Sequence, residues 1–143
     1  MSPSNWLVAH LVSVALLAGV GWVVQIVVYP GFERVGRAEW AAYHAGHTRG
    51  IARVVAVPWI LQAVSTVALL VAPPPGQRLA TLVLAALALA GVAATVLVAV
   101  PAHRRLGGSE RVRRTELAVL LRANLVRTWA WTLSTALAAA LQA

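Results

Sequence analysis

The chain has 143 residues, of which 60% are hydrophobic and 11% are charged, and its mean hydropathy is +0.78. Its charged side chains are twelve Arg and four Glu, the net charge is +8, and there is no Cys. Because soluble domains are about 25% charged, this composition excludes a disordered chain, a disulfide-linked secreted domain and an ordinary cytosolic enzyme. We therefore expect a single domain, residues 1–143, that lies in a membrane.

Four apolar stretches are long enough to cross a bilayer, which takes about 20 residues. The predicted spans cover residues 6–28, 51–72, 79–100 and 119–141. The first three carry almost no charge, whereas the fourth contains Arg122, Asn124 and Arg127 in its first half. The predicted fold class is an all-α integral membrane protein, a bundle of four transmembrane helices.

The segments between the spans predict the orientation of the bundle. Most Arg and all four Glu lie between spans 1 and 2 or between spans 3 and 4, whereas the segment between spans 2 and 3 holds Arg78 alone. The positive-inside rule places the first and third loops in the cytoplasm and both termini outside a bacterial inner membrane. We expect the second helix to begin near Ala38 and the fourth at Ser109–Glu110, so both extend beyond the membrane on the cytoplasmic side.

Polar side chains within the helices gather at one depth, near the predicted cytoplasmic ends. All four helices contribute to this level: Gln25, Tyr29, Tyr43, His44, His47, His103, Asn124 and Arg127. Only His10 lies near the opposite end. Because an unsatisfied polar group is costly in hydrocarbon, the clustering predicts a polar pocket in the cytoplasmic half of the bundle. An interfacial belt of polar residues is the alternative interpretation, and it explains Asn124 and Arg127 poorly.

The residue types at this level favour binding of an anionic or phenolic substrate. Arg127 beside Asn124 suits a carboxylate, phosphate or phenolate, since a guanidinium binds such groups with two parallel hydrogen bonds. The full predicted substrate-binding set is Gln25, Tyr29, Tyr43, Asn124, Arg127 and Trp131. The surrounding Trp, Leu and Val side chains suit a flat apolar molecule such as a quinone.

His44, His47 and His103 are the candidate catalytic residues, because imidazole exchanges protons near neutral pH. The same three side chains are also candidate metal ligands, since His44 and His47 are three residues apart on one expected helix and His103 lies at equal depth. Iron, copper or a haem is then the cofactor in question. Acid–base chemistry without a metal remains the other interpretation.

Other functions stay open at this point. The chain can serve as a non-enzymatic binding or assembly subunit, or as an anion or small-molecule transporter built from several copies. Proton-coupled export of cations is not expected, because no Asp or Glu lies in a span. The basic segment HRRLGGSERVRR is explained by anionic lipid headgroups, so no nucleic-acid partner is expected. The expected partners are the lipid bilayer and an apolar small molecule, and the Ala- and Gly-rich third helix offers a face for a homo-oligomer.

Four segments, QIVVYPGF, AYHAGHTRGI, VPAHRRLGG and LLRANLVRTWAW, resemble a group of small bacterial four-helix membrane proteins related to the anthrone-oxygenase-like family. The pattern falls here on Tyr29-Pro30, His44 with His47, Pro101-Ala102-His103, and Asn124, Arg127, Thr128 and Trp131. The resemblance implies an oxygen-using oxidation of an aromatic substrate. There is a weaker likeness to small four-helix membrane protoporphyrinogen oxidases, but this sequence lacks the run of residues that is characteristic of them after the first span. The combined expectation is a membrane-embedded oxidoreductase that acts on an apolar aromatic or quinone-like molecule.

Overall fold

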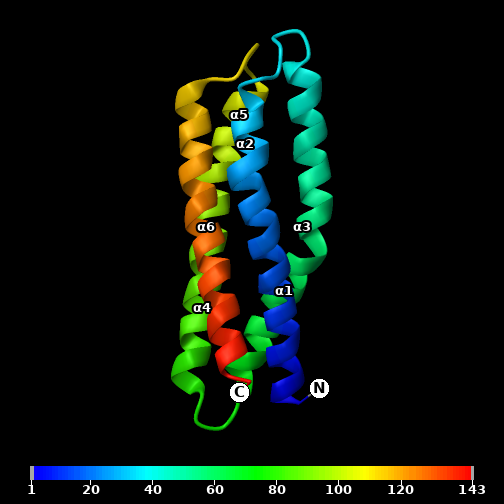
Figure 1. Ribbon diagram of the computed structural model, residues 1–143. Helices are drawn as coiled ribbons and strands as arrows, with labels where there is room; N and C mark the ends of the chain where they lie inside the picture. Colours follow the sequence, from blue (N-terminus) through cyan, green and yellow to red (C-terminus); the bar gives the residue numbers. More distant parts are fainter. Residues whose placement is uncertain (1, 143) are drawn as a thin grey trace.

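The computed structural model describes residues 2–142, which form an antiparallel bundle of four long helices (Figure 1). Met1 and Ala143, the ends of the predicted domain, lie outside the described residues. The first helix consists of α1 (Pro3–Val23), η1 (Val24–Val28) and α2 (Tyr29–Phe32), and the second is α3 (Trp40–Val71). The third consists of α4 (Arg78–Ala93), η2 (Ala94–Ala99) and α5 (Val100–Gly107), and the fourth is α6 (Arg114–Ala140).

The two ends of the bundle differ in what they hold. Loops 33–39 and 108–113 lie together at one end, here called the loop end, whereas both termini and the turn 72–77 lie at the other, the terminal end (Figure 1). Helix α1 packs against α3 and α6, and α4 packs against α6 and α3. The four helices therefore form a closed ring in the order α1, α3, α4–α5, α6.

Three of the four helices are long and apolar enough to cross a membrane: Pro3–Phe32, Trp40–Val71 and Arg78–Gly107. The structure thus confirms the predicted all-α class and has the outward apolar character of a membrane protein. Helix α6 is 27 residues long but less apolar, because it contains Arg122 and Arg127. It also contains Asn124, Thr128 and Ser134, which are all buried inside the bundle.

The starts of two helices test the sequence-based boundaries. Helix α3 begins at Trp40, close to the expected Ala38. The expectation for the fourth helix was wrong, since α6 begins at Arg114 and not at Ser109. The Ser109 hydroxyl lies 2.8 Å from the carbonyl oxygens of Leu106 and Arg111, so it closes the loop rather than capping a helix.

Two π-helical segments lie at matching positions in the first and third helices. Segment η1 ends just before Tyr29-Pro30 and η2 ends just before Val100-Pro101. A proline in a helix has no N–H to donate, and its ring clashes with the carbonyl four residues earlier. In both places the residue before the proline instead bonds the carbonyl five residues back, Tyr29 to Val24 and Val100 to Thr95. Such π turns occur frequently at functional sites.

The loop end is held by an aromatic core and by ion pairs. Trp40 and Phe32 are completely buried and pack edge-on, and the Trp40 indole N–H donates to the Leu106 carbonyl at 3.1 Å. These contacts fix the start of α3 against α2 and α5. At the surface, ion pairs tie the first loop to the region after α5: Arg37 with Glu110, and Glu33 with Arg114.

Candidate functional site

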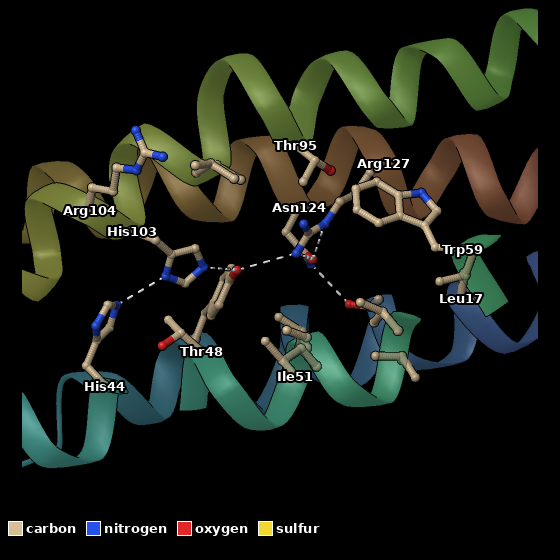
Figure 2. A pocket seen from close by; sticks show the side chains of 18 of the residues that line it. Leu17, His44, Thr48, Ile51, Trp59, Thr95, His103, Arg104, Asn124 and Arg127 are labelled. Carbon is tan, nitrogen blue, oxygen red and sulfur yellow. Dashed lines mark hydrogen bonds between the residues drawn. The ribbon is translucent and has the colours of Figure 1, made fainter. Parts of the chain in front are cut away.

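A cavity of about 550 Å³ lies between the four helices in the loop-end half (Figure 2). Its volume is in the usual range of small-molecule pockets, about 300–1000 Å³. Most of its wall is apolar, with Leu17 and Trp59 at the end toward the middle of the bundle. The polar side chains in the wall are Tyr29, His44, Thr48, Thr95, His103, Arg104, Asn124 and Arg127.

Three of these polar side chains form a continuous hydrogen-bonded chain across three helices (Figure 2). His44 Nε2 of α3 lies 3.1 Å from His103 Nδ1 of α5, and His103 Nε2 lies 3.1 Å from the Tyr29 hydroxyl of α2. Each nitrogen can donate or accept depending on the tautomer. The hydrogen-bonded chain therefore has two consistent proton arrangements. In one, each group donates toward His44, and in the other each group donates toward Tyr29.

The Tyr29 hydroxyl also connects this chain to Arg127 of α6. Arg127 Nη2 donates to the hydroxyl at 3.4 Å, and its Nε and Nη2 donate to Asn124 Oδ1 at 3.0 and 2.9 Å. Within residues 2–142, Arg127 forms no ion pair with a carboxylate. A partly buried cation with only neutral partners is well placed to bind an anionic group in the cavity.

Asn124 fixes this arginine to the first helix. The Asn124 side chain is completely buried, and its Nδ2 donates to the Gly21 carbonyl at 3.0 Å and to Gln25 Oε1 at 2.7 Å. Its oxygen and both hydrogens are thus all bonded. Gln25 therefore supports the site through Asn124 and is not among the residues that line the cavity.

Trp131 forms part of the wall beside Arg127. The Arg127 guanidinium carbon lies 5.9 Å from the centre of the Trp131 ring, within the range of a cation–π contact. The Trp131 indole N–H donates to Gln62 Oε1 at 3.2 Å. Gln62 is buried and lies in the middle of a predicted span, but sequence reasoning did not single it out. A lone amide in an otherwise apolar run was the available signal.

Two other predicted residues lie near the cavity without lining it. The His47 ring packs against Tyr29, Phe32 and His103 at centroid distances of 6.1, 5.0 and 5.9 Å. Its Nε2 is buried and has no hydrogen-bond partner among the described residues. Tyr43 is 44% exposed and contacts Phe32 edge-on, so the structure does not bring it to the cavity wall.

The three imidazoles are close together, but their arrangement does not fit a metal centre. Within residues 2–142, no group of three His, Cys, Asp or Glu side chains is placed to hold a metal ion. Both nitrogens of His103 are in hydrogen bonds with His44 and Tyr29. Two axial haem ligands would lie on opposite faces of the macrocycle, whereas His44 and His103 bond each other directly.

His10 forms a second polar cluster toward the terminal end. It is completely buried, with Nδ1 3.3 Å from the Ser65 hydroxyl and Nε2 3.1 Å from the Ser134 hydroxyl. The sequence correctly separated His10 from the other histidines by depth, but it gave no sign of these partners. The cluster joins α1 to α3 and α6 and lies outside the cavity wall.

The site is therefore a mostly apolar cavity with two arginines, one phenol and two linked imidazoles in its wall. No protein-family profile, curated protein or solved structure matches this chain.

Proposed function

We propose that this chain is a membrane-embedded oxidoreductase that acts on an apolar aromatic or quinone-like molecule bound in the cavity. One observation carries the proposal: the hydrogen-bonded chain from Arg127 through Tyr29 and His103 to His44, set in the wall of an otherwise apolar cavity. Oxidation or reduction of a quinone-type ring adds or removes protons at oxygen, so such a site needs a route for protons and a group that tolerates negative charge.

The setting in the membrane is part of the proposal. The exposed side chains of α6 include Val126, Trp129 and Leu133, whereas its polar Asn124 and Ser134 are buried, which supports α6 as a fourth span. The Arg-rich loop end then lies in the cytoplasm and both termini lie outside the inner membrane. The cavity sits in the cytoplasmic half of the bilayer.

Tyr29 and the two imidazoles would move a proton between the substrate and the loop end. In one arrangement the Tyr29 hydroxyl donates to His103 Nε2, and His103 Nδ1 donates its hydrogen to His44 Nε2. A proton that leaves a substrate oxygen for Tyr29 is passed along the same bonds to His44, and the reverse order delivers one. Gly107 leaves room for the His44 ring, since a Cβ there would lie 3.3 Å from Nδ1.

Arg127 and Asn124 would hold the substrate oxygen while it carries negative charge. Their mutual bonds fix the guanidinium before the substrate arrives, so little reorganisation is needed during the reaction. Molecular oxygen is the oxidant that fits the proposal: a hydroquinone passes two electrons and two protons to one O₂, which yields the quinone and hydrogen peroxide. No resident metal is required for this balance.

Oxygen uptake by the purified protein tests the proposal, with 1,4-naphthohydroquinone as the substrate. We expect Tyr29→Phe and His103→Ala to lower the rate by about 100-fold or more, the usual contribution of acid–base groups. Tyr43→Phe is the matched control, because Tyr43 is exposed and outside the cavity wall, and it should leave the rate unchanged.

Two results would overturn the proposal. One is equal activity in the Tyr29 variant, the His103 variant and the control. The other is a stoichiometric metal or a haem absorption band that disappears in His103→Ala, which would make the imidazoles ligands instead of a proton route. A colourless, inactive protein that always co-purifies with one partner would instead identify a binding or assembly subunit.

A further inference from the structure

The exposed residues of the cavity wall lie on one side, between α3 and the third helix. The wall residues from the first and fourth helices are buried or half-buried. The exposed wall residues all belong to α3 or to α5: Ala52, Val100, Arg104 and Gly107. The opening, called the lateral opening below, is therefore the seam that Ala52 and Val100 flank.

Contacts toward both ends of the bundle bound the seam that contains the lateral opening. At the loop end, the bond between His44 and His103 joins α3 to α5. Toward the terminal end, Leu69 of α3 and Leu84 of α4 belong to one buried cluster. Between these contacts α3 lines the cavity with Ala45, Thr48, Ile51, Ala52, Val55 and Trp59. The exposed one among them, Ala52, has a small side chain.

The exposed surface around the lateral opening is apolar apart from Arg49, Arg53 and Arg104. Val54 and Val57 of α3 are 56% and 72% exposed, and Val96 and Leu97 of η2 are 55% and 72% exposed. In a membrane-spanning bundle such surfaces face the lipid chains. Arg104, at the loop-end edge of the opening, is long enough to reach the headgroups. A molecule that uses this route comes from the bilayer and not from water.

We infer that the ligand of this cavity is a tailed amphiphile: an aromatic or quinone ring held near Arg127, with an alkyl or isoprenoid tail that passes through the lateral opening into the bilayer. The ring identity rests on the proposed function, whereas the tail rests on the opening alone. The tail stays in hydrocarbon both before and after binding, so it adds little to the affinity measured within the membrane. An enclosed pocket would instead exclude a ligand that carries such a tail.

Quenching of tryptophan fluorescence in phosphatidylcholine nanodiscs tests this inference, because Trp59 and Trp131 line the cavity. The two probes are 2,3-dimethoxy-5-methyl-1,4-benzoquinone and the same ring with a decyl tail. We expect the two membrane-phase dissociation constants to agree within about threefold in the natural chain. Ala52→Phe should weaken binding of the tailed probe by about tenfold or more, which is about 1.4 kcal/mol, and should affect the tail-less probe much less.

Val54→Phe is the matched control, two residues away on the lipid-facing side and outside the cavity wall, and it should leave both probes unaffected. If Ala52→Phe does not elute as a folded protein, Val100→Phe blocks the opposite edge of the seam. Rejection of the tailed probe by the natural chain, or equal effects of Ala52→Phe on both probes, would overturn the lateral opening. Arg127→Gln tests the ring site separately: binding that is unchanged for both probes would contradict the proposed function whatever the Ala52 variant does.

Discussion

Gly21 of the first helix packs closely against Thr128 of the fourth, and its replacement by Ala has a calculable effect. A Cβ at Gly21 would lie 2.5 Å from Thr128 Oγ1 and 3.2 Å from Thr128 Cβ and Cγ2. Thr128 is completely buried, so it cannot turn away. The two helices must therefore separate by roughly 1 Å, the difference from ordinary van der Waals contact.

Gly19 offers the matched control on the same helix, because a Cβ there meets nothing within 4 Å. Both substitutions gain the same helix propensity, so their difference isolates the steric effect. We expect Gly21→Ala to be less stable than Gly19→Ala by about 1–3 kcal/mol, the usual cost of overpacking. The assay is reversible unfolding by SDS in mixed micelles, followed by tryptophan fluorescence.

A second substitution checks the cause. Thr128→Ala removes the two closest conflicting atoms, Oγ1 and Cγ2, so the Gly21→Ala and Thr128→Ala double variant should recover most of the loss. The separation would also stretch the bond from Asn124 to the Gly21 carbonyl and move Arg127, so substrate turnover should fall with stability. Equal stabilities of the Gly21 and Gly19 variants would refute the close approach of the two helices.

Three further predictions concern the polar groups and the π segments. Asn124→Leu should cost about 1–3 kcal/mol in the same unfolding assay, because it removes two bonds between helices and two to a cation; a loss no larger than that of an exposed control would contradict the buried network. His10→Leu should cost about 1–2 kcal/mol but leave turnover unchanged, because His10 is remote from the cavity wall; a large loss of turnover at normal stability would assign His10 to the reaction. Pro101→Ala should allow an ordinary α-helical turn that rotates His103 away from Tyr29, so turnover should fall about tenfold or more with little change in stability. An unaltered rate would show that the proline does not hold the π turn.

The sequence predicted the all-helical fold from its apolar stretches, and it predicted much of the site from the depth of its polar residues. Polar residues at one level of a membrane-spanning bundle must meet in its interior, because lipid chains offer them no hydrogen-bond partner. This reasoning placed Tyr29, His44, His103 and Arg127 together, and the structure links them by hydrogen bonds. It failed for Tyr43, since a residue at the right depth can still face outward when it lies one position away on the helix.

Other parts of the site were beyond sequence reasoning. The lateral opening depends on small side chains such as Ala52, which look ordinary in an Ala-rich chain. The bond between the His44 and His103 rings depends on the rotation of α5, which the π segment before it sets. Such rotations decide whether a set of histidines can bind a metal together or forms a hydrogen-bonded chain. The spacing of the histidines along the sequence does not reveal these rotations.

The two π segments also determine which side chains of the first and third helices face the cavity. A π turn holds about one residue more than an α-helical turn, so each segment acts as a single-residue insertion in a helix that keeps its length and position. Everything beyond the insertion is rotated by about 100° compared with an uninterrupted α-helix. Tyr29 and His103 both lie beyond an insertion, on helices that face each other across the bundle, whereas Asn124 and Arg127 lie on the unbroken α6. Deletion of one residue from η1 or η2 would therefore rotate Tyr29 or His103 out of the site while the helices keep their order, so the assembly of this site depends on single-residue differences in helix length.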